Sequence, residues 1–383
     1  MGSVQFECGL PGDLAVRCVD LTPFVGRAIS RDLGTAPNPA EPRGRVTIQG
    51  VEGGRATSAP LESMLGDAGD GLVVGWTADG AVVVDDGARI ELRGTSDDLL
   101  VRVGSDVDGW RLLRDVVRPA IQVAALGRGT VVAHAAAVEV DGTTVVIAGW
   151  SESGKTETAL ALVESGASFL GDKWTVLAHR SSAEPGDVIV GPFPNRVGVR
   201  RWVLPYLPRL ATALGRPRHA RLAAGAAVAA AAGRVRSATR GSRTLDAVIG
   251  PIGALAGLTD TVRLSPDAVR RAYGDDRPTS EPILGALILL DTIEAGGDAG
   301  IGRLDARSAA VAMARSAAYE RRRYHLLGER LAGREPSIVP GFEIVAREAD
   351  AIEALLANVA TYRLRAPFPA DPTIAAGLIS SVL

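Results

Sequence analysis

Residues 149–156 read Gly-Trp-Ser-Glu-Ser-Gly-Lys-Thr and match the pattern G-x-x-x-x-G-K-[ST] at every fixed position. The two glycines of this pattern let backbone N–H groups curl around phosphate oxygens, and a helix that follows adds the positive end of its dipole. Lys155 is placed to reach the β- and γ-phosphates, and Thr156 can offer its hydroxyl to Mg²⁺. The segment therefore predicts a nucleoside triphosphate site. Its expected nucleotide-binding residues are Gly149, Trp150, Ser151, Glu152, Ser153, Gly154, Lys155, Thr156 and the adjacent Glu157.

Two other interpretations of the glycine segment are less favoured. A glycine-rich turn that only joins a strand to a helix would leave Lys155 in solvent, but the complete spacing and the apolar run before it favour phosphate binding. Dinucleotide binding of the Rossmann type needs glycines spaced as G-x-G-x-x-G, and they do not fall that way here.

A carboxylate follows the glycine segment at a useful spacing. Asp172, in Phe-Leu-Gly-Asp-Lys, comes sixteen residues after Thr156. It can bind Mg²⁺, directly or through water, or take the proton of an attacking hydroxyl. An ordinary aspartate in a turn at a strand end is the alternative. After a complete phosphate-binding loop, the functional interpretation is preferred.

The elements that position these residues follow from apolar patterning. Residues 131–140 and 143–148, joined by Asp141-Gly142, predict a β-hairpin that leads into the glycine segment, and 156–164 predict a helix. Further expected elements are a strand at 168–177 that contains Asp172, a buried strand at 283–290, and helices at 306–329 and 351–360.

Before this core, residues 1–108 predict a β-rich amino-terminal module, with residues 73–74 and 81–84 on two strands of a hairpin. Residues 110–126 have helical spacing that is interrupted at Pro119. The expected organisation is a mixed α/β protein with a β-rich module at 1–108 and a nucleotide-binding core at 109–383.

Composition limits the classes of partner and compartment. Lys+Arg 42 against Asp+Glu 44 gives a net charge of −2, which argues against a nucleic-acid or anionic-membrane partner. The apolar run 222–233 is shorter than the roughly 20 residues of a membrane span. Cys8 and Cys18 lack partners for a zinc site or a disulfide framework, and a reducing cytoplasm is expected.

The segments His-Ala-Ala-Ala-Val at 134–138, the glycine loop with Lys-Thr-Glu-Thr-Ala-Leu, and Ser-Gly-Ala-Ser-Phe-Leu-Gly-Asp at 165–172 resemble the HPr kinase/phosphorylase superfamily. Its small relatives include kinases that act on peptide natural-product precursors. The resemblance, carried mainly by residues 110–178, implies a core shared with ATP-dependent phosphoenolpyruvate carboxykinase. It implies that Lys155 and Thr156 hold phosphates and metal, that Glu157 lies beside the metal, and that Asp172 is general base and metal ligand.

The resemblance also places His134 near the phosphoryl-transfer site, whereas its apolar neighbours are typical of a core histidine, and both interpretations stay open. The sequence departs from the family at Lys173, where a second acidic residue is expected. No segment resembles the Arg-Gly signature of the bifunctional enzymes, which argues against phosphorolysis and against HPr as substrate. Arg200, among the arginines after Pro192, is the preferred clamp for phosphate or an acidic substrate.

These observations favour an ATP- and Mg²⁺-dependent kinase that transfers the γ-phosphate to a hydroxyl of a small molecule or peptide. Asp172, Lys155, His134 and Arg200 are the expected catalytic residues, and Thr156, Asp172 and Glu157 the expected metal ligands. A nucleotide-binding regulatory module without turnover and a carboxykinase-type enzyme acting on a small acid are the alternatives. The amino-terminal module is a candidate substrate lid, recognition module, or dimer surface of a homo-oligomer.

Overall fold

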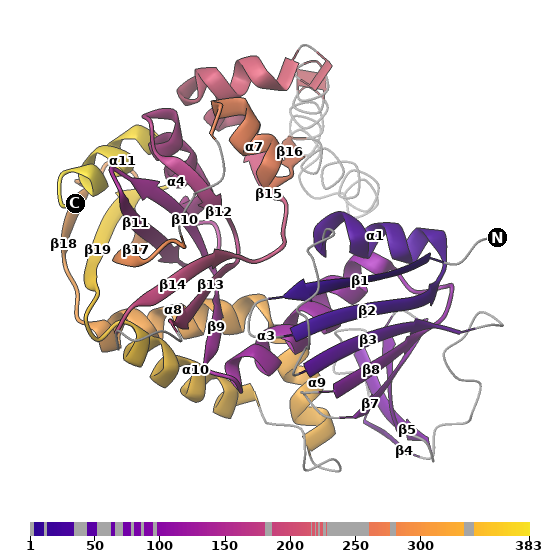
Figure 1. Cartoon of the computed structure of the whole chain (residues 1–383). Helices are drawn as coiled ribbons and strands as arrows, with labels where there is room; N and C mark the ends of the chain where they lie inside the picture. The colour runs from indigo at the N-terminus through magenta and orange to yellow at the C-terminus, as the bar shows by residue number, and fades with distance from the viewer. Residues whose placement is uncertain are drawn as a thin grey trace, which may run out of the picture.

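A computed structural model gives the protein a mixed α/β fold (Figure 1). The structure describes residues 4–10, 14–33, 44–51, 63–65, 72–77, 80–85, 88–94, 98–180, 186–215, 260–275, 281–332 and 341–383, with isolated positions between 217 and 227.

An eight-stranded sheet contains every strand described before residue 104. Its order is β1-β2-β3-β8-β7-β6-β5-β4, parallel between β2, β3 and β8 and antiparallel elsewhere. The expected hairpin is confirmed, since Val73 pairs with Val84 and Val74 with Val83. The elements are β1 Val4–Leu10, β2 Leu14–Leu21, α1 Pro23–Leu33, β3 Gly44–Gly50, β4 Ser63–Leu65, β5 Leu72–Thr77, β6 Gly80–Asp85, β7 Ala88–Gly94 and β8 Asp98–Val103.

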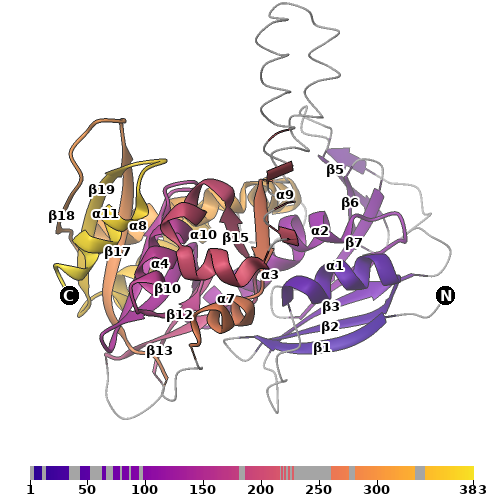
Figure 2. The same ribbon diagram turned by 90° about the horizontal axis from the view of Figure 1, so that it is seen from above.

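One interrupted helix joins this sheet to the rest of the chain. It comprises α2 Gly109–Leu112, the π-helical segment η1 Leu113–Val117 and α3 Arg118–Leu126. Pro119 has no backbone N–H, so the carbonyl of Asp115 has no α-helical hydrogen-bond partner. In the turn just before Pro119, the N–H of Arg118 donates to the carbonyl of Leu113, five residues earlier, which is the π-helical pattern. The interruption expected at Pro119 therefore takes the form of a π turn. In both views α3 and α9 lie between the two halves of the molecule (Figures 1 and 2).

The second half is built on a six-stranded sheet of order β12-β10-β11-β17-β19-β18 and a three-stranded sheet of order β14-β13-β9. The strands are β9 Thr130–Ala133, β10 Ala135–Val140, β11 Thr143–Gly149, β12 Ser168–Gly171, β13 Thr175–His179, β14 Val188–Pro192, β15 Val197–Arg200, β16 Thr261–Leu264, β17 Leu284–Ile293, β18 Gly300–Arg303 and β19 Ala360–Pro367. The helices are α4 Lys155–Glu164, η2 Arg201–Tyr206, α7 Pro266–Tyr273, α8 Ala306–Glu320, α9 Arg322–Ala332, α10 Gly341–Leu355 and α11 Pro372–Ser380.

The central strands are apolar throughout because both faces of the six-stranded sheet are covered. Along β11, Val145 and Ile147 pack into a core with α4 and α11, whereas Val146 and Ala148 pack into the opposite core with α8 and α10. The expected hairpin is confirmed for β10 and β11, but its first arm begins at Ala135 rather than at residue 131, because β9 belongs to the three-stranded sheet. The turn residues Asp141 and Gly142 have φ of 47° and 80°. This geometry is the one that two-residue hairpins favour.

The chain passes between the six- and three-stranded sheets twice at nearly the same place. His134 separates β9 from β10, and residues 172–174 separate β12 from β13. The partners Ala133 with Thr175 and Ala137 with Gly171 lie on either side of these two crossings. The strand expected at 168–177 is therefore two strands in different sheets, and the expectation that Asp172 lies inside a strand is wrong.

The later elements correct some expected boundaries. The strand at 283–290 is confirmed as β17, which extends to Ile293. The helix expected at 306–329 is divided into α8 and α9 at Arg321. The helix expected at 351–360 ends at Leu355, and Ala360 begins β19. No helix in the described ranges is long and apolar enough to cross a membrane. Most of the run 222–233 lies outside those ranges.

A buried ion pair fixes the junction of α8, α9 and α10. Arg321 and Glu348 are each 2% exposed, and Arg321 Nη1 donates to Glu348 Oε1 over 3.1 Å while Nη2 donates to Oε2. Burial raises the pKa of Glu348, and the guanidinium opposes that rise. The charges compensate each other as long as both are present.

We expect Glu348→Gln to lower the free energy of unfolding by about 3 kcal/mol or more, because it leaves the Arg321 guanidinium buried without a counter-charge. Urea unfolding followed by circular dichroism measures the change. Glu343→Gln on the same helix is the matched control, since its partner Arg347 is 64% exposed and such surface pairs contribute little. Equal stability of the two variants would contradict the prediction.

Candidate functional site

The glycine segment lies between β11 and α4, as the sequence predicts. Gly154, with φ 93°, precedes α4, and no side chain caps the first turn of that helix. The backbone N–H groups at the start of α4 therefore have no intrahelical acceptor and can bind an anion. The hydroxyl of Ser153 is buried and has no hydrogen-bond partner among the described residues. A buried donor without a partner is costly, and a phosphate oxygen would satisfy it.

The two fixed glycines are required by their surroundings. A Cβ at Gly149 would lie 2.6 Å from the carbonyl oxygen of Leu290, on the neighbouring strand. A Cβ at Gly154 would lie 3.0 Å from the ring of Phe368, and φ at this position is left-handed. The loop therefore packs tightly against β17 and the end of β19.

Lys155 is folded back over its own loop. Its ammonium donates to the carbonyl oxygens of Gly149 and Trp150, at 3.0 and 2.6 Å. Burial lowers its pKa to about 8, while attraction from Asp172 and Glu320 opposes that shift. The side chain is therefore still mostly protonated at neutral pH, although its pKa of about 8 lies close to that pH.

Thr156 and Asp172 are in direct contact. The Thr156 hydroxyl lies 2.8 and 3.0 Å from the two carboxylate oxygens of Asp172, and it can donate to either. Asp172 is 6% exposed and lies in the crossing between β12 and β13, where Lys173 adopts a left-handed φ of 66°. Burial raises the pKa of Asp172, and the bond from Thr156 is the largest opposing contribution. A carboxylate with a raised pKa is a stronger base than an exposed one.

His134 lies at the other crossing and contacts the loop through Ser316. The Ser316 hydroxyl donates to Gly149 O over 2.8 Å, and His134 Nδ1 lies 3.0 Å from the same hydroxyl. Because the serine proton is used by the carbonyl, Nδ1 carries the histidine proton and Nε2 is left as an acceptor. Burial lowers the pKa of His134 well below its ordinary value, and the positive charge of Lys155 adds to the effect. The imidazole is therefore neutral.

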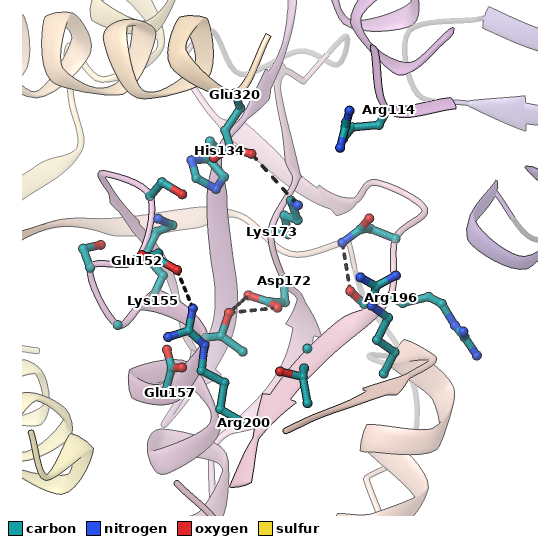
Figure 3. Close-up of a pocket in the computed structure, with 18 of the residues that line it drawn as sticks. Arg114, His134, Glu152, Lys155, Glu157, Asp172, Lys173, Arg196, Arg200 and Glu320 are labelled. Atoms are coloured by element: carbon teal, nitrogen blue, oxygen red, sulfur yellow. Dashed lines mark hydrogen bonds and ion pairs between the residues drawn. The ribbon is translucent and has the colours of Figure 1, made fainter. Parts of the chain in front are cut away.

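Arg200 and Glu157 lie next to each other below Lys155 in Figure 3. Arg200 Nη2 donates to Glu152 Oε1 over 2.7 Å, so the expected phosphate clamp is paired with a residue of the loop. Glu152 holds this position with a left-handed φ of 61°. Glu157 is 7% exposed, and burial raises its pKa.

One pocket of about 350 Å³ brings the expected site residues together. Of the residues expected from the sequence, it is lined by His134, Ser151, Glu152, Ser153, Gly154, Lys155, Thr156, Glu157, Asp172 and Arg200. Gly149 and Trp150 do not line it, and the Trp150 ring instead packs on Tyr319 with centroids 5.1 Å apart.

Lys173, at the position where the resemblance led us to expect a second acidic residue, also lines the pocket. Its ammonium lies 4.0 Å from a carboxylate oxygen of Glu320, the last residue of α8. Glu320 therefore adds a carboxylate to those near the loop, but it comes from a distant part of the chain and lies close to a lysine.

The donor set is compatible with Mg²⁺ bound together with phosphates. In the described part of the chain, no group of three or more His, Cys, Asp or Glu side chains could hold a metal by itself. Mg²⁺ at phosphate sites uses one or two carboxylates, a hydroxyl, waters and phosphate oxygens, so no such group is required. The contact between Thr156 and Asp172 places a hydroxyl and a carboxylate oxygen together, which is the part of that set the protein supplies.

Sequence reasoning missed Ser316, which contacts His134 without lining the pocket, and several residues that do line it. Ser316 and Glu320 lie on α8, and Ser316 is 182 residues from His134, so no local pattern connects them. Asp32, Trp110, Arg114, Arg118, Asn195, Arg196, Thr261, Arg263 and Phe368 also line the pocket. Asn195 and Arg196 belong to the arginine-containing run after Pro192, and Trp110, Arg114 and Arg118 belong to the helix expected at 110–126, but none of them was expected to be a site residue.

No known protein-family model matches the chain, and no curated protein resembles it at a significant level. The interpretation of the pocket therefore rests on its own residues and geometry.

We expect Asp172→Asn to raise the melting temperature at neutral pH. Unlike Glu348, Asp172 forms no direct ion pair with a described residue, so its replacement leaves no guanidinium or ammonium without its contact partner. Burial raises the pKa of Asp172, which means that its ionised form costs stability at neutral pH, and the amide removes that charge while its oxygen still accepts from Thr156. The difference from wild type should shrink as pH falls towards the ordinary value of 3.8, because wild-type Asp172 then becomes protonated. Differential scanning calorimetry from neutral to acidic pH tests this. A variant less stable than wild type at neutral pH would show that ionised Asp172 stabilises the fold.

Proposed function

We propose that the protein is an ATP- and Mg²⁺-dependent kinase that transfers the γ-phosphate to a hydroxyl of a small molecule or a peptide. The observation that carries the proposal is the contact of Thr156 with Asp172 beside Lys155 in one pocket. Phosphoryl transfer depends on positioning and on neutralising charge, and these three side chains are of the types that do both.

The loop residues would bind the triphosphate. Ser153, Gly154, Lys155 and Thr156 all line the same pocket, and the first turn of α4 has no side-chain cap. Lys155 would exchange the two loop carbonyls for phosphate oxygens, which offer a full negative charge in place of a dipole.

Asp172 would orient the acceptor hydroxyl and take its proton. Its burial excludes water and raises its pKa, which strengthens it as a base. His134, which lines the same pocket, is neutral, and its Nε2 is a second acceptor. Thr156 and Asp172, with Glu157 nearby, would hold Mg²⁺, which neutralises charge on the transferred phosphoryl group when it is bound.

The order of elements supports a core of the HPr kinase and phosphoenolpyruvate carboxykinase type. A hairpin leads into the loop, α4 follows it, and Asp172 comes directly after the next strand. The six-stranded sheet is mixed, with antiparallel strands at both edges. Lys173 and the missing signature segment favour the kinase direction without phosphorolysis.

We expect the affinity for ATP with Mg²⁺ to weaken roughly tenfold between about pH 7 and about pH 9. Lys155 is charged below its pKa of about 8, loses its proton above it, and then attracts phosphate less strongly. Isothermal titration calorimetry with a non-hydrolysable ATP analogue measures the change.

Lys155→Ala should bind the analogue weakly and without this pH dependence, and the melting-temperature rise that the nucleotide gives wild type should largely disappear. Arg347→Gln, an exposed change on α10, should behave like wild type. If Lys155→Ala bound the analogue as tightly as wild type, the nucleotide would bind elsewhere.

Asp172→Asn should lower phosphoryl transfer by about 10²- to 10⁴-fold and change analogue affinity only a few-fold, because the loop carries the phosphate contacts. Transfer of label from [γ-³²P]ATP to a cell metabolite extract and to peptides gives the readout. Activity within a few-fold of wild type would remove Asp172 from its role. Tight ATP binding by wild type with no transfer would favour the regulatory-module alternative.

A further inference from the structure

The pocket extends beyond the phosphate loop to a second basic end. Counting only the described residues, seven basic and five acidic side chains line it. Much of the acidic charge is already used in ion pairs inside the pocket. These pairs are Asp32–Arg118, Glu152–Arg200 and Glu320–Lys173, at 3.4, 2.7 and 4.0 Å.

Arg196 and Arg263 have no acidic partner in the parts of the chain that the structure describes. Arg196 comes from the turn between β14 and β15 and is half-buried, whereas Arg263 comes from β16 and is exposed. Two unpaired guanidiniums at one end of a concave pocket form a site for an anionic group, since each can donate two parallel hydrogen bonds to a phosphate or carboxylate.

The Trp110 ring contacts two of the arginines at this end, Arg114 and Arg263. The guanidinium carbon of Arg114 lies 4.5 Å from the centre of the indole, and that of Arg263 lies 5.8 Å from it. Arg114 is also fixed by Asp115, with both hydrogen bonds at 2.6 Å. Stacking on one ring brings together arginines from the linking helix and from β16, and it restricts their freedom before any ligand binds.

Arg118 adds a buried positive charge behind this end. Arg118 is 5% exposed, and the distance from its Nη2 to the carboxylate of Asp32 is a long 3.4 Å. Its Nε–H has no partner within the described ranges. The acidic side chains at this end therefore do not neutralise all of its positive charge, and the electrostatic potential that remains attracts anions.

The spatial order within the pocket gives this end its role. Figure 3 shows Glu152 and Lys155 on one side, Arg114 and Arg196 on the other, and Asp172 with Lys173 between them. A molecule whose hydroxyl meets Asp172 thus extends away from the phosphate loop towards the arginines. The volume of about 350 Å³ lies at the lower end of ligand pockets, so the occupant beside a triphosphate is small.

We propose that Arg196 and Arg263 bind an anionic group, a phosphate or a carboxylate, on the small hydroxyl compound that accepts the phosphoryl group. This inference rests on the proposed function and names its substrate class: hydroxy acids or phosphate monoesters with a free hydroxyl. Neutral alcohols lack the group that the arginines recognise. Transfer forms a bond between the acceptor oxygen and the γ-phosphorus, breaks the bond to the β–γ bridging oxygen, and passes the hydroxyl proton to Asp172, with ADP as the other product.

Calorimetric titration of the full chain, saturated with a non-hydrolysable ATP analogue and Mg²⁺, tests the proposal. The probes are glycerol 3-phosphate, glycerate and glycerol, which share a hydroxylated three-carbon skeleton and differ in charge. Wild type should bind an anionic probe at least tenfold more tightly than glycerol, and the better of the two anions identifies phosphate or carboxylate. The double variant Arg196→Gln/Arg263→Gln should lose at least tenfold in that affinity, because it lacks two charge-assisted contacts.

Two further variants separate recognition from a structural effect. The double variant Arg196→Lys/Arg263→Lys keeps the charge and should recover part of the lost affinity, and Arg347→Gln should match wild type. Affinity for the ATP analogue should stay within twofold in all of them. If the glutamine variant lost analogue affinity instead, the arginines would belong to the nucleotide site and the proposal would be wrong.

Two other results would also overturn it: equal binding of glycerol and the anionic probes, or no binding of either anion to wild type. If the analogue itself failed to bind wild type, the proposed function would be wrong. The anionic probes titrated without nucleotide would then still test the arginines, because only a working arginine end makes wild type bind them more tightly than the glutamine variant.

Discussion

The burial of the Asp172 carboxylate against the Thr156 hydroxyl constrains the rest of the site. A buried charge is tolerated only where hydrogen bonds and opposite charges compensate its lost hydration. The compensation comes from the first turn of α4, from Lys155 and from Lys173, so the loop, the helix and the crossing between β12 and β13 must keep one relative position. The tight packing of Gly149 on β17 and of Gly154 on Phe368 supports this position from the outside.

The two crossings between the sheets are the reason that the site residues are buried. A residue at the end of a single strand would lie at the sheet edge, near solvent. His134 and Asp172 instead lie where the chain passes between two sheets, and both are buried while still lining the pocket. The interior environment shifts both pKa values in the direction that disfavours charge. The result is a neutral imidazole and a strengthened carboxylate base on neighbouring segments.

The sequence allowed prediction of the elements whose signals are local. The hairpin, the glycine loop and α4 follow one another within a short stretch, and each is marked by its own turn or periodicity. The apolar pattern of residues 168–177 continues across the break at Asp172, and only pairing with β10 on one side and β9 on the other shows that two sheets are involved. The arginine end of the pocket could not be predicted from the sequence for a related reason. Arg114, Arg196 and Arg263 come from separate elements, and the indole of Trp110 that gathers two of them is recognisable only in three dimensions.

Several polar side chains at the loop already have partners within the protein: Lys155 bonds two carbonyls, Arg200 bonds Glu152, and Thr156 bonds Asp172. A ligand that bound Lys155, Arg200 or Thr156 would therefore replace existing contacts, whereas the Ser153 hydroxyl and the N–H groups at the start of α4 would gain new ones. A ligand that offers a single anionic oxygen recovers only part of what it displaces, whereas a longer polyanion compensates all of it at once. If the loop has the proposed function, these internal bonds would favour a ligand that presents several charges together, such as a triphosphate, over one that presents a single charge.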